Sequence, residues 1–193
     1  MSGFFQYRTR GGMHVRIVVI TGSPHRNGTS ALLADKFIQG ATEAGNEVYR
    51  FDAAFENVHP CIGCDTCECG KRPCVFKDGM TGLYAELLKA DMVVFVTPLY
   101  YHAMSSQIKM AVDRFHGIDD LLRGTDKKAM LLVSAASTDK RIMNGVVGSY
   151  LETTHYLGWQ DTGILLAYGC YSRSDMEKTD YPEKALQLGR AVR

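Results

Sequence analysis

The 193-residue sequence lacks any apolar run that approaches the roughly 18 residues a membrane-spanning helix needs. The first twelve residues also lack the hydrophobic segment of a secretory signal, so we expect 1–12 to be a disordered extension or tag of a cytoplasmic protein. Neither sign of charge is in excess, because the sequence has 22 basic and 21 acidic residues and a net charge of +1. With no basic stripe, neither a nucleic-acid partner nor a membrane partner is expected.

Two nucleotide-binding signatures are missing from the polar segment Gly22–Ser30, which contains neither Gly-x-Gly-x-x-Gly nor a Gly-Lys-Ser/Thr ending. An NTPase is therefore disfavoured, and so is a dinucleotide fold with Asp52 as its ribose-binding acid. The segment is longer than helix capping needs, which favours a phosphate monoester at a helix N-terminus over an ordinary capped turn. The predicted phosphate-binding residues are Ser23, Arg26, Asn27, Gly28, Thr29 and Ser30.

Strand and helix patterns alternate along the chain, with no internal repeat. Apolar, β-branched runs predict strands at 15–21, 47–51, 91–97, 128–134 and 163–169, with Pro98 ending the third. Amphipathic periodicity predicts helices around 34–41, 80–88, 108–115, 143–151 and 182–192. Five such units indicate an α/β fold with a doubly wound, five-stranded parallel sheet in the order 2-1-3-4-5, forming a single domain over 13–193. Loops that follow the strands then meet at one edge, where ligands bind.

Five of the six cysteines lie in the segment 53–77, which is predicted to be a loop. The spacing Cys61-x2-Cys64-x2-Cys67-x6-Cys74 is close to the compact run that wraps a cubane iron–sulfur cluster. Zinc also needs four thiolates, but its ligand pairs are usually further apart in sequence. Cys69 adds a competing thiol, so metal-free thiols remain a third alternative. Cys170 lies in an apolar stretch and is expected in the core.

Two longer motifs carry a resemblance to a known family. Residues 19–30 (VITGSP…NGTS) and 97–114 (TPLYYHAMS…QIK…VDR) resemble the NAD(P)H-dependent FMN reductase family of flavodoxin-like proteins. The resemblance implies FMN with its phosphate on the first turn and its isoalloxazine on the loop after the third strand. The residues implied for the ring are Pro98, Leu99, Tyr100, Tyr101, Ala103 and Ser134, although the loop 134–137 departs from the family's glycine-containing version. Asp113-Arg114 is expected to fix a helix or subunit contact.

The implied chemistry is hydride transfer from NAD(P)H to FMN and onward to a flavin, a quinone or a similar acceptor. Hydride transfer depends on alignment of donor and acceptor, so no dedicated catalytic side chain is expected. His25 and His102 are nearest the predicted site, and we expect both to be structural.

The cysteines also give the chain the look of the iron–sulfur flavoprotein subgroup. That resemblance implies a [4Fe–4S] cluster on Cys61, Cys64, Cys67 and Cys74 that exchanges electrons with FMN, often in a neighbouring subunit of a homodimer or homotetramer. The alternative function is then an electron carrier between redox proteins. Cluster-free relatives with cysteines in this loop keep the metal-free alternative open.

Overall fold

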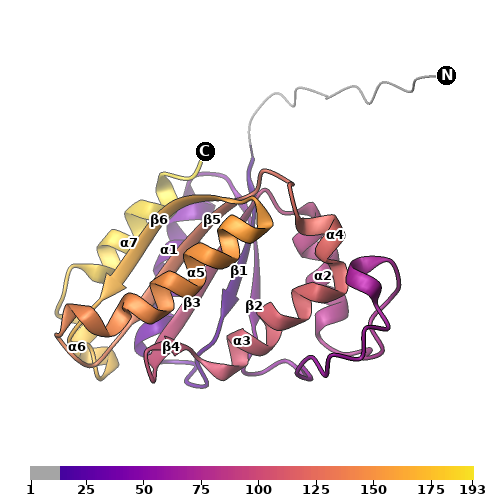
Figure 1. Ribbon diagram of the computed structural model, residues 1–193. Helices are drawn as coiled ribbons and strands as arrows, with labels where there is room; N and C mark the ends of the chain where they lie inside the picture. The colour runs from indigo at the N-terminus through magenta and orange to yellow at the C-terminus, as the bar shows by residue number, and fades with distance from the viewer. Residues whose placement is uncertain (1–13) are drawn as a thin grey trace.

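The structure, a computed structural model, describes residues 14–193, and the extension predicted over 1–12 lies outside them. Its centre is a parallel sheet in the order β2-β1-β3-β5-β6 (Figure 1). The strands are β1 (Arg16–Thr21), β2 (Glu47–Asp52), β3 (Met92–Tyr100), β5 (Lys128–Ser134) and β6 (Gln160–Ala167). The short β4 (Ala103–Met104) pairs antiparallel with β3. Counting the parallel strands alone gives the order 2-1-3-4-5, so the predicted flavodoxin-like fold is confirmed.

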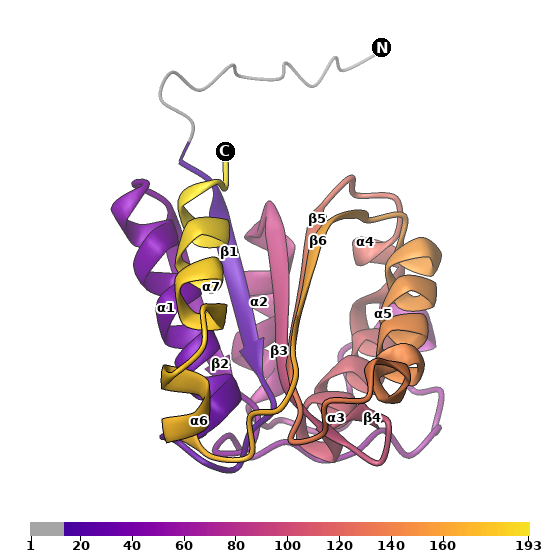
Figure 2. The same ribbon diagram turned by 90° about the vertical axis from the view of Figure 1, so that its left-hand side faces the viewer.

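Helices cover both faces of the sheet (Figure 2). One face carries α1 (Thr29–Glu43), α6 (Arg173–Glu177) and α7 (Tyr181–Arg190); the other carries α2 (Met80–Lys89), α3 (Ser106–Asp113), α4 (Asp119–Leu122) and α5 (Asn144–Leu157). Alternate residues of β1 enter the two cores, Ile17 and Val19 against α1 and Val18 and Ile20 against α2. Burial on both faces explains the continuous apolar runs of the strands. Within residues 14–193, every helix is too short or too polar to span a bilayer.

The third strand does not end at Pro98, as the sequence predicted, but continues to Tyr100 and turns into β4. The reason lies in the neighbouring strand. Val96 accepts a hydrogen bond from Gly22 N at 2.9 Å, beside the end of β1. Residues two apart in a strand point their N–H groups to the same side, so the donor that Pro98 lacks faces a strand that has already ended. The missing hydrogen bond is replaced, because Gly22 O accepts one from the Ser105 hydroxyl at 2.6 Å.

The carboxyl ends of the strands share one edge of the sheet, and the connecting loops meet there (Figure 1). Short 3₁₀ segments lie in three of the connections: η1 (Glu68–Gly70) between β2 and α2, η2 (Arg114–Ile118) after α3, and η3 (Lys140–Met143) before α5. The cysteines from Cys61 to Cys74 lie in the long connection from β2 to α2, whose η1 segment packs against η2 and α4.

Candidate functional site

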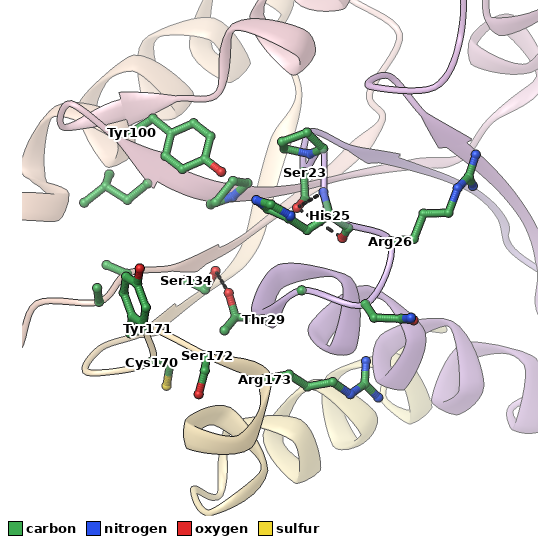
Figure 3. Close-up of a pocket in the computed structure, with 17 residues that line it drawn as sticks. Ser23, His25, Arg26, Thr29, Tyr100, Ser134, Cys170, Tyr171, Ser172 and Arg173 are labelled. Carbon is green, nitrogen blue, oxygen red and sulfur yellow. Dashed lines mark hydrogen bonds between the residues drawn. The ribbon is translucent and has the colours of Figure 1, made fainter.

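A cavity of about 720 Å³ opens at this edge, within the size range of small-molecule and cofactor sites (Figure 3). Four connections form it: the turn between β1 and α1, the end of β3, the loop after β5 and the loop between β6 and α6. The cavity therefore lies at the switch point of the sheet, where ligands of doubly wound folds bind.

The turn between β1 and α1 is built to leave donors free. Gly28 precedes the first turn of α1 and has no side chain to cap it, so the first amides of a 15-residue helix keep their hydrogen-bonding capacity. Ser23 folds the turn by accepting a hydrogen bond from His25 N at 3.1 Å. Thr29 Oγ1 and Ser134 Oγ lie 2.9 Å apart, which ties the turn to the end of β5 (Figure 3). The helix dipole and these donors suit an anion such as a phosphate monoester.

Ser105, just before α3, anchors the β3–β4 hairpin to the same turn. Its hydroxyl donates to Gly22 O at 2.6 Å, and its backbone N–H donates to Thr97 Oγ1 at 3.0 Å. The approach at Gly22 is close enough that a Cβ there would meet the Ser105 hydroxyl and would lie 2.8 Å from Ile108 Cβ. Glycine is therefore required at this position.

The hairpin itself holds two residues in the left-handed region, Tyr101 (φ 46°) and His102 (φ 63°). A two-residue hairpin turn usually uses Asn or Gly at such positions, so the backbone is strained here. Tyr101 is fully exposed at the tip, and His102 Nδ1 lies 3.1 Å from Ile142 O. The structural role predicted for His102 is consistent with that contact.

The structure brings most of the predicted flavin residues to one cavity. Its lining includes Ser23, Arg26, Asn27, Gly28, Thr29, Pro98, Leu99, Tyr100 and Ser134. Three predicted residues are not in the lining: Ser30 is buried in α1, Ala103 pairs with Tyr100, and Tyr101 points outward. Arg26 is in the lining, but its guanidinium stacks 3.7 Å above the Phe55 ring.

The sequence interpretation missed the loop after β6, which closes the cavity on the side of α6 with Cys170, Tyr171, Ser172 and Arg173. The available signal was the rule that every loop after a strand meets the same edge. Cys170 is buried, as expected, and burial raises the pKa of its thiol. Ser172 and Asp175 form a reciprocal capping box that fixes the loop at the start of α6.

Four cysteines of the cysteine loop, the connection from β2 to α2, line a second cavity of about 20 Å³, which is far smaller than the first. Its lining includes all four predicted ligands, Cys61, Cys64, Cys67 and Cys74. Cys69, the competing thiol, is outside that lining, and its Sγ is 3.8 Å from either ring nitrogen of His116. The cysteines of residues 14–193 are all free thiols. The four lining thiols are the donor set that a cubane cluster takes.

The ligands of a single metal ion must all surround one atom. Zinc needs four ligands around one centre. Across residues 14–193 no three His, Cys, Asp or Glu side chains are grouped so as to hold one ion. The zinc alternative therefore finds no preformed site in the described chain.

A buried ion pair fixes the base of the cysteine loop. Arg114 Nη1 donates to Asp78 Oδ2 at 2.8 Å and to His59 O at 2.8 Å. Burial opposes the charge on Asp78, but hydrogen bonds from Arg114 and from the N–H groups of His59 and Met80 outweigh it and lower its pKa to about 2. Asp113 pairs with Lys109 one turn earlier on α3, which fits the helix contact expected of Asp113-Arg114, and Arg114 fixes this loop as well.

Comparison with known proteins agrees with this geometry. The family model described as NADPH-dependent FMN reductase matches residues 15–148. An iron–sulfur flavoprotein of Methanocaldococcus jannaschii is 32% identical over 92% of this chain and 95% of its own length. Another, from Archaeoglobus fulgidus, is 38% identical over 51% of this chain and 49% of its own.

Among solved structures, the NAD(P)H:quinone oxidoreductase from Methanothermobacter marburgensis superposes with a TM-score of 0.78 at 19% identity, covering 92% of this chain and 96% of that one. Its likeness shows the fold. The family match spans the turn between β1 and α1, the cysteine loop, the hairpin and Ser134, and the similarity to the iron–sulfur relative extends over nearly the whole chain. The chain belongs to the NADPH-dependent FMN reductase family, in the subgroup of the iron–sulfur flavoproteins.

Proposed function

We propose that this FMN-dependent NAD(P)H oxidoreductase binds FMN in the 720 Å³ cavity, with the phosphate on the turn 23–30 and the ring against the end of β3. The observation that carries the proposal is the uncapped N-terminus of α1 opening into that cavity beside Thr29 and Ser134. When bound, FMN supplies the centre that accepts hydride from NAD(P)H. The chain's own part is to hold the phosphate, orient the ring and leave one side open to the nicotinamide.

The ring position is supported by the shape of the cavity wall. Pro98 and Leu99 line it near the carboxyl end of β3, and Tyr100 adds an aromatic side chain. The contacts of Ser105 hold this wall and the phosphate turn together, which keeps the two ends of a bound cofactor in register. We assign no acid or base role, because alignment is what hydride transfer requires.

A [4Fe–4S] cluster on Cys61, Cys64, Cys67 and Cys74 is the second part of the proposal. It is supported by their shared cavity, by the position of Cys69 outside that cavity, and by the similarity of the chain to proteins named iron–sulfur flavoproteins. A cluster passes single electrons, whereas NAD(P)H delivers a hydride. The acceptor is then a small molecule or a redox protein, and service as an electron carrier between proteins is the second candidate function.

The cavities of FMN and cluster share no lining residue within one chain. The resemblance to iron–sulfur flavoproteins implies electron exchange between the cluster and the FMN of a neighbouring subunit, and we therefore propose a homodimer or homotetramer. We further propose that 13–193 is a single domain preceded by an extension, and that the protein works in the cytoplasm without a nucleic-acid or membrane partner.

The test is an absorption spectrum of anaerobically purified protein with FMN, iron and sulfide analysis. We expect flavin bands, stoichiometric FMN, and about four irons and four sulfides per chain. Cys74→Ser should lose the iron and keep FMN, whereas Cys69→Ser should keep both. A colourless protein that fails to bind added FMN would refute the flavin site, and flavin bands without iron would refute the cluster.

A further inference from the structure

A cation is buried directly under the cysteine loop. The Arg114 side chain is only 1% exposed, as is that of Asp78, its ion-pair partner. Arg114 Nη2 donates to Asp78 Oδ1 at 3.2 Å, and the guanidinium lies 5.2 Å from the Phe76 ring centroid. Phe76 in turn stacks on His59 at 4.8 Å. These contacts hold the guanidinium in one orientation.

One donor of this guanidinium is left over. Arg114 Nε is buried and finds no hydrogen-bond partner among the described residues. Arg114 also lines the cavity formed by Cys61, Cys64, Cys67 and Cys74. A buried N–H without an acceptor is costly, so a native protein that keeps one calls for an explanation. Thiolates in this cavity would supply the acceptor.

We infer that Arg114 sets the reduction potential of the site by donating its free Nε–H to a sulfur held there and by placing a buried positive charge beside it. The inference rests on the cluster proposed above. Hydrogen bonds to the sulfurs and net charge are two of the levers that fix the potential of such a cluster. A nearby positive charge favours the form that carries one more electron, so Arg114 raises the potential.

Asp78 has the opposite effect in this arrangement. It orients the guanidinium through two hydrogen bonds, and its carboxylate offsets part of the positive charge. Asp78 is therefore a positioning residue whose charge lowers the potential. Removing the charge of Arg114 and removing that of Asp78 should therefore shift the reduction potential in opposite directions. Two residues with a merely structural role would not give opposite shifts.

The experiment is a potentiometric titration of the anaerobic holoprotein, followed by the electron paramagnetic resonance of the reduced cluster. At a fixed ambient potential, we expect Arg114→Gln to lower the ratio of reduced to oxidised cluster about tenfold, equivalent to 59 mV for a one-electron couple. Asp78→Asn should raise that ratio. Arg72→Gln removes the same charge from the exposed surface of the same loop, where Arg72 pairs with Glu68, and should change the ratio by less than about twofold.

Iron content separates the outcomes. If the wild-type protein holds no iron, the proposed cluster fails and the inference fails with it. If Arg114→Gln retains full iron and an unchanged potential, the inference alone is overturned. Should Arg114→Gln not fold, Asp78→Asn with an unchanged or lowered potential overturns it equally. A shift in Arg72→Gln as large as that in Arg114→Gln would also overturn it, since general surface charge would then explain the effect.

Discussion

At the scale of single residues, the contact between Thr29 and Ser134 joins two loops across the cavity. Thr29→Val keeps the shape of the side chain and removes the hydroxyl. We expect the Kd for FMN to rise about tenfold, since a hydrogen bond to a charged group contributes roughly 1.5 kcal/mol or more. Isothermal titration of apoprotein with FMN measures this. Thr153→Val, on α5 and away from the cavity, is the matched control, and an unchanged affinity in Thr29→Val would remove Thr29 from the phosphate site.

Lys127, at the end of the sheet opposite the cavity, should make the stability of the fold depend on pH. Its side chain is buried and donates to Ala90 O at 2.6 Å. Burial lowers its pKa below the usual 10.5, and Asp91 offsets this only in part. The unfolded chain therefore binds more protons than the folded one in the window below 10.5, so this residue's contribution to stability rises with pH there.

The measurement is the free energy of unfolding in urea between pH 7.5 and 10. The wild-type value minus that of Lys127→Met should increase across this range, because only the wild type has a buried amine that sheds its proton early. Lys89→Met, at an exposed position, should give a flat difference. A difference for Lys127→Met that is also flat, or that falls with pH, would contradict the assignment.

At the scale of elements, Gly22 decides how closely the phosphate turn approaches α3. An added methyl group would meet the Ser105 hydroxyl and Ile108 Cβ, neither of which is at the end of a long flexible side chain. We expect Gly22→Ala to lower the free energy of unfolding by about 2 kcal/mol and to weaken FMN binding. Gly148→Ala, in open space on α5, is the control and should not destabilise the protein. A fully stable Gly22→Ala variant with normal FMN affinity would show that the hairpin can shift without loss.

The hydrophobic pattern of the sequence predicted the helices and strands that pack in the core. Strands buried on both faces, such as β1 and β5, stand out as apolar runs, and the helices between consecutive strands indicate that the strands are parallel. The hairpin was not predictable in this way. In the sequence alone, Pro98 predicts the end of a strand. Whether its missing N–H matters depends on where the neighbouring strand β1 ends, and that is known only from the tertiary structure.

In the candidate site too, some residues could be predicted from the sequence and others depend on the tertiary structure. The turn 22–30 could be singled out from the sequence because its polar residues are contiguous, and most of them line the cavity. Tyr101 and Ala103 belong to the same motif as Tyr100, yet the left-handed backbone at Tyr101 and His102 turns the chain back on itself and sends Tyr101 outward. The loop with Ser172 and Arg173 carries no motif, and only the topology brings it to the cavity.

At the scale of the whole molecule, the cavity proposed for FMN (the flavin cavity) and the cavity proposed for the cluster (the cysteine cavity) lie at separate places on one chain. The flavin cavity lies over the ends of β1, β3 and β5, whereas the cysteine cavity is bounded by η2 and by the long connection from β2. Neither needs the other to form, since each has its own anchors: Ser105 for the first, and the pair of Arg114 with Asp78 for the second. Hydride chemistry and single-electron chemistry should therefore be separable by mutation.

Cys74→Ser provides that separation. Because Cys74 lies outside the lining of the flavin cavity, NADPH should bleach the FMN of the variant at a rate within about twofold of the wild type. Reduction of a one-electron acceptor such as a ferredoxin should fall at least about tenfold, since the variant would lack a ligand of the proposed cluster, through which single electrons would leave. Stopped-flow absorbance follows both reactions, with Cys69→Ser as the control that keeps both rates. If Cys74→Ser reduces ferredoxin as fast as the wild type, electrons leave from the flavin directly and the protein acts as a reductase alone.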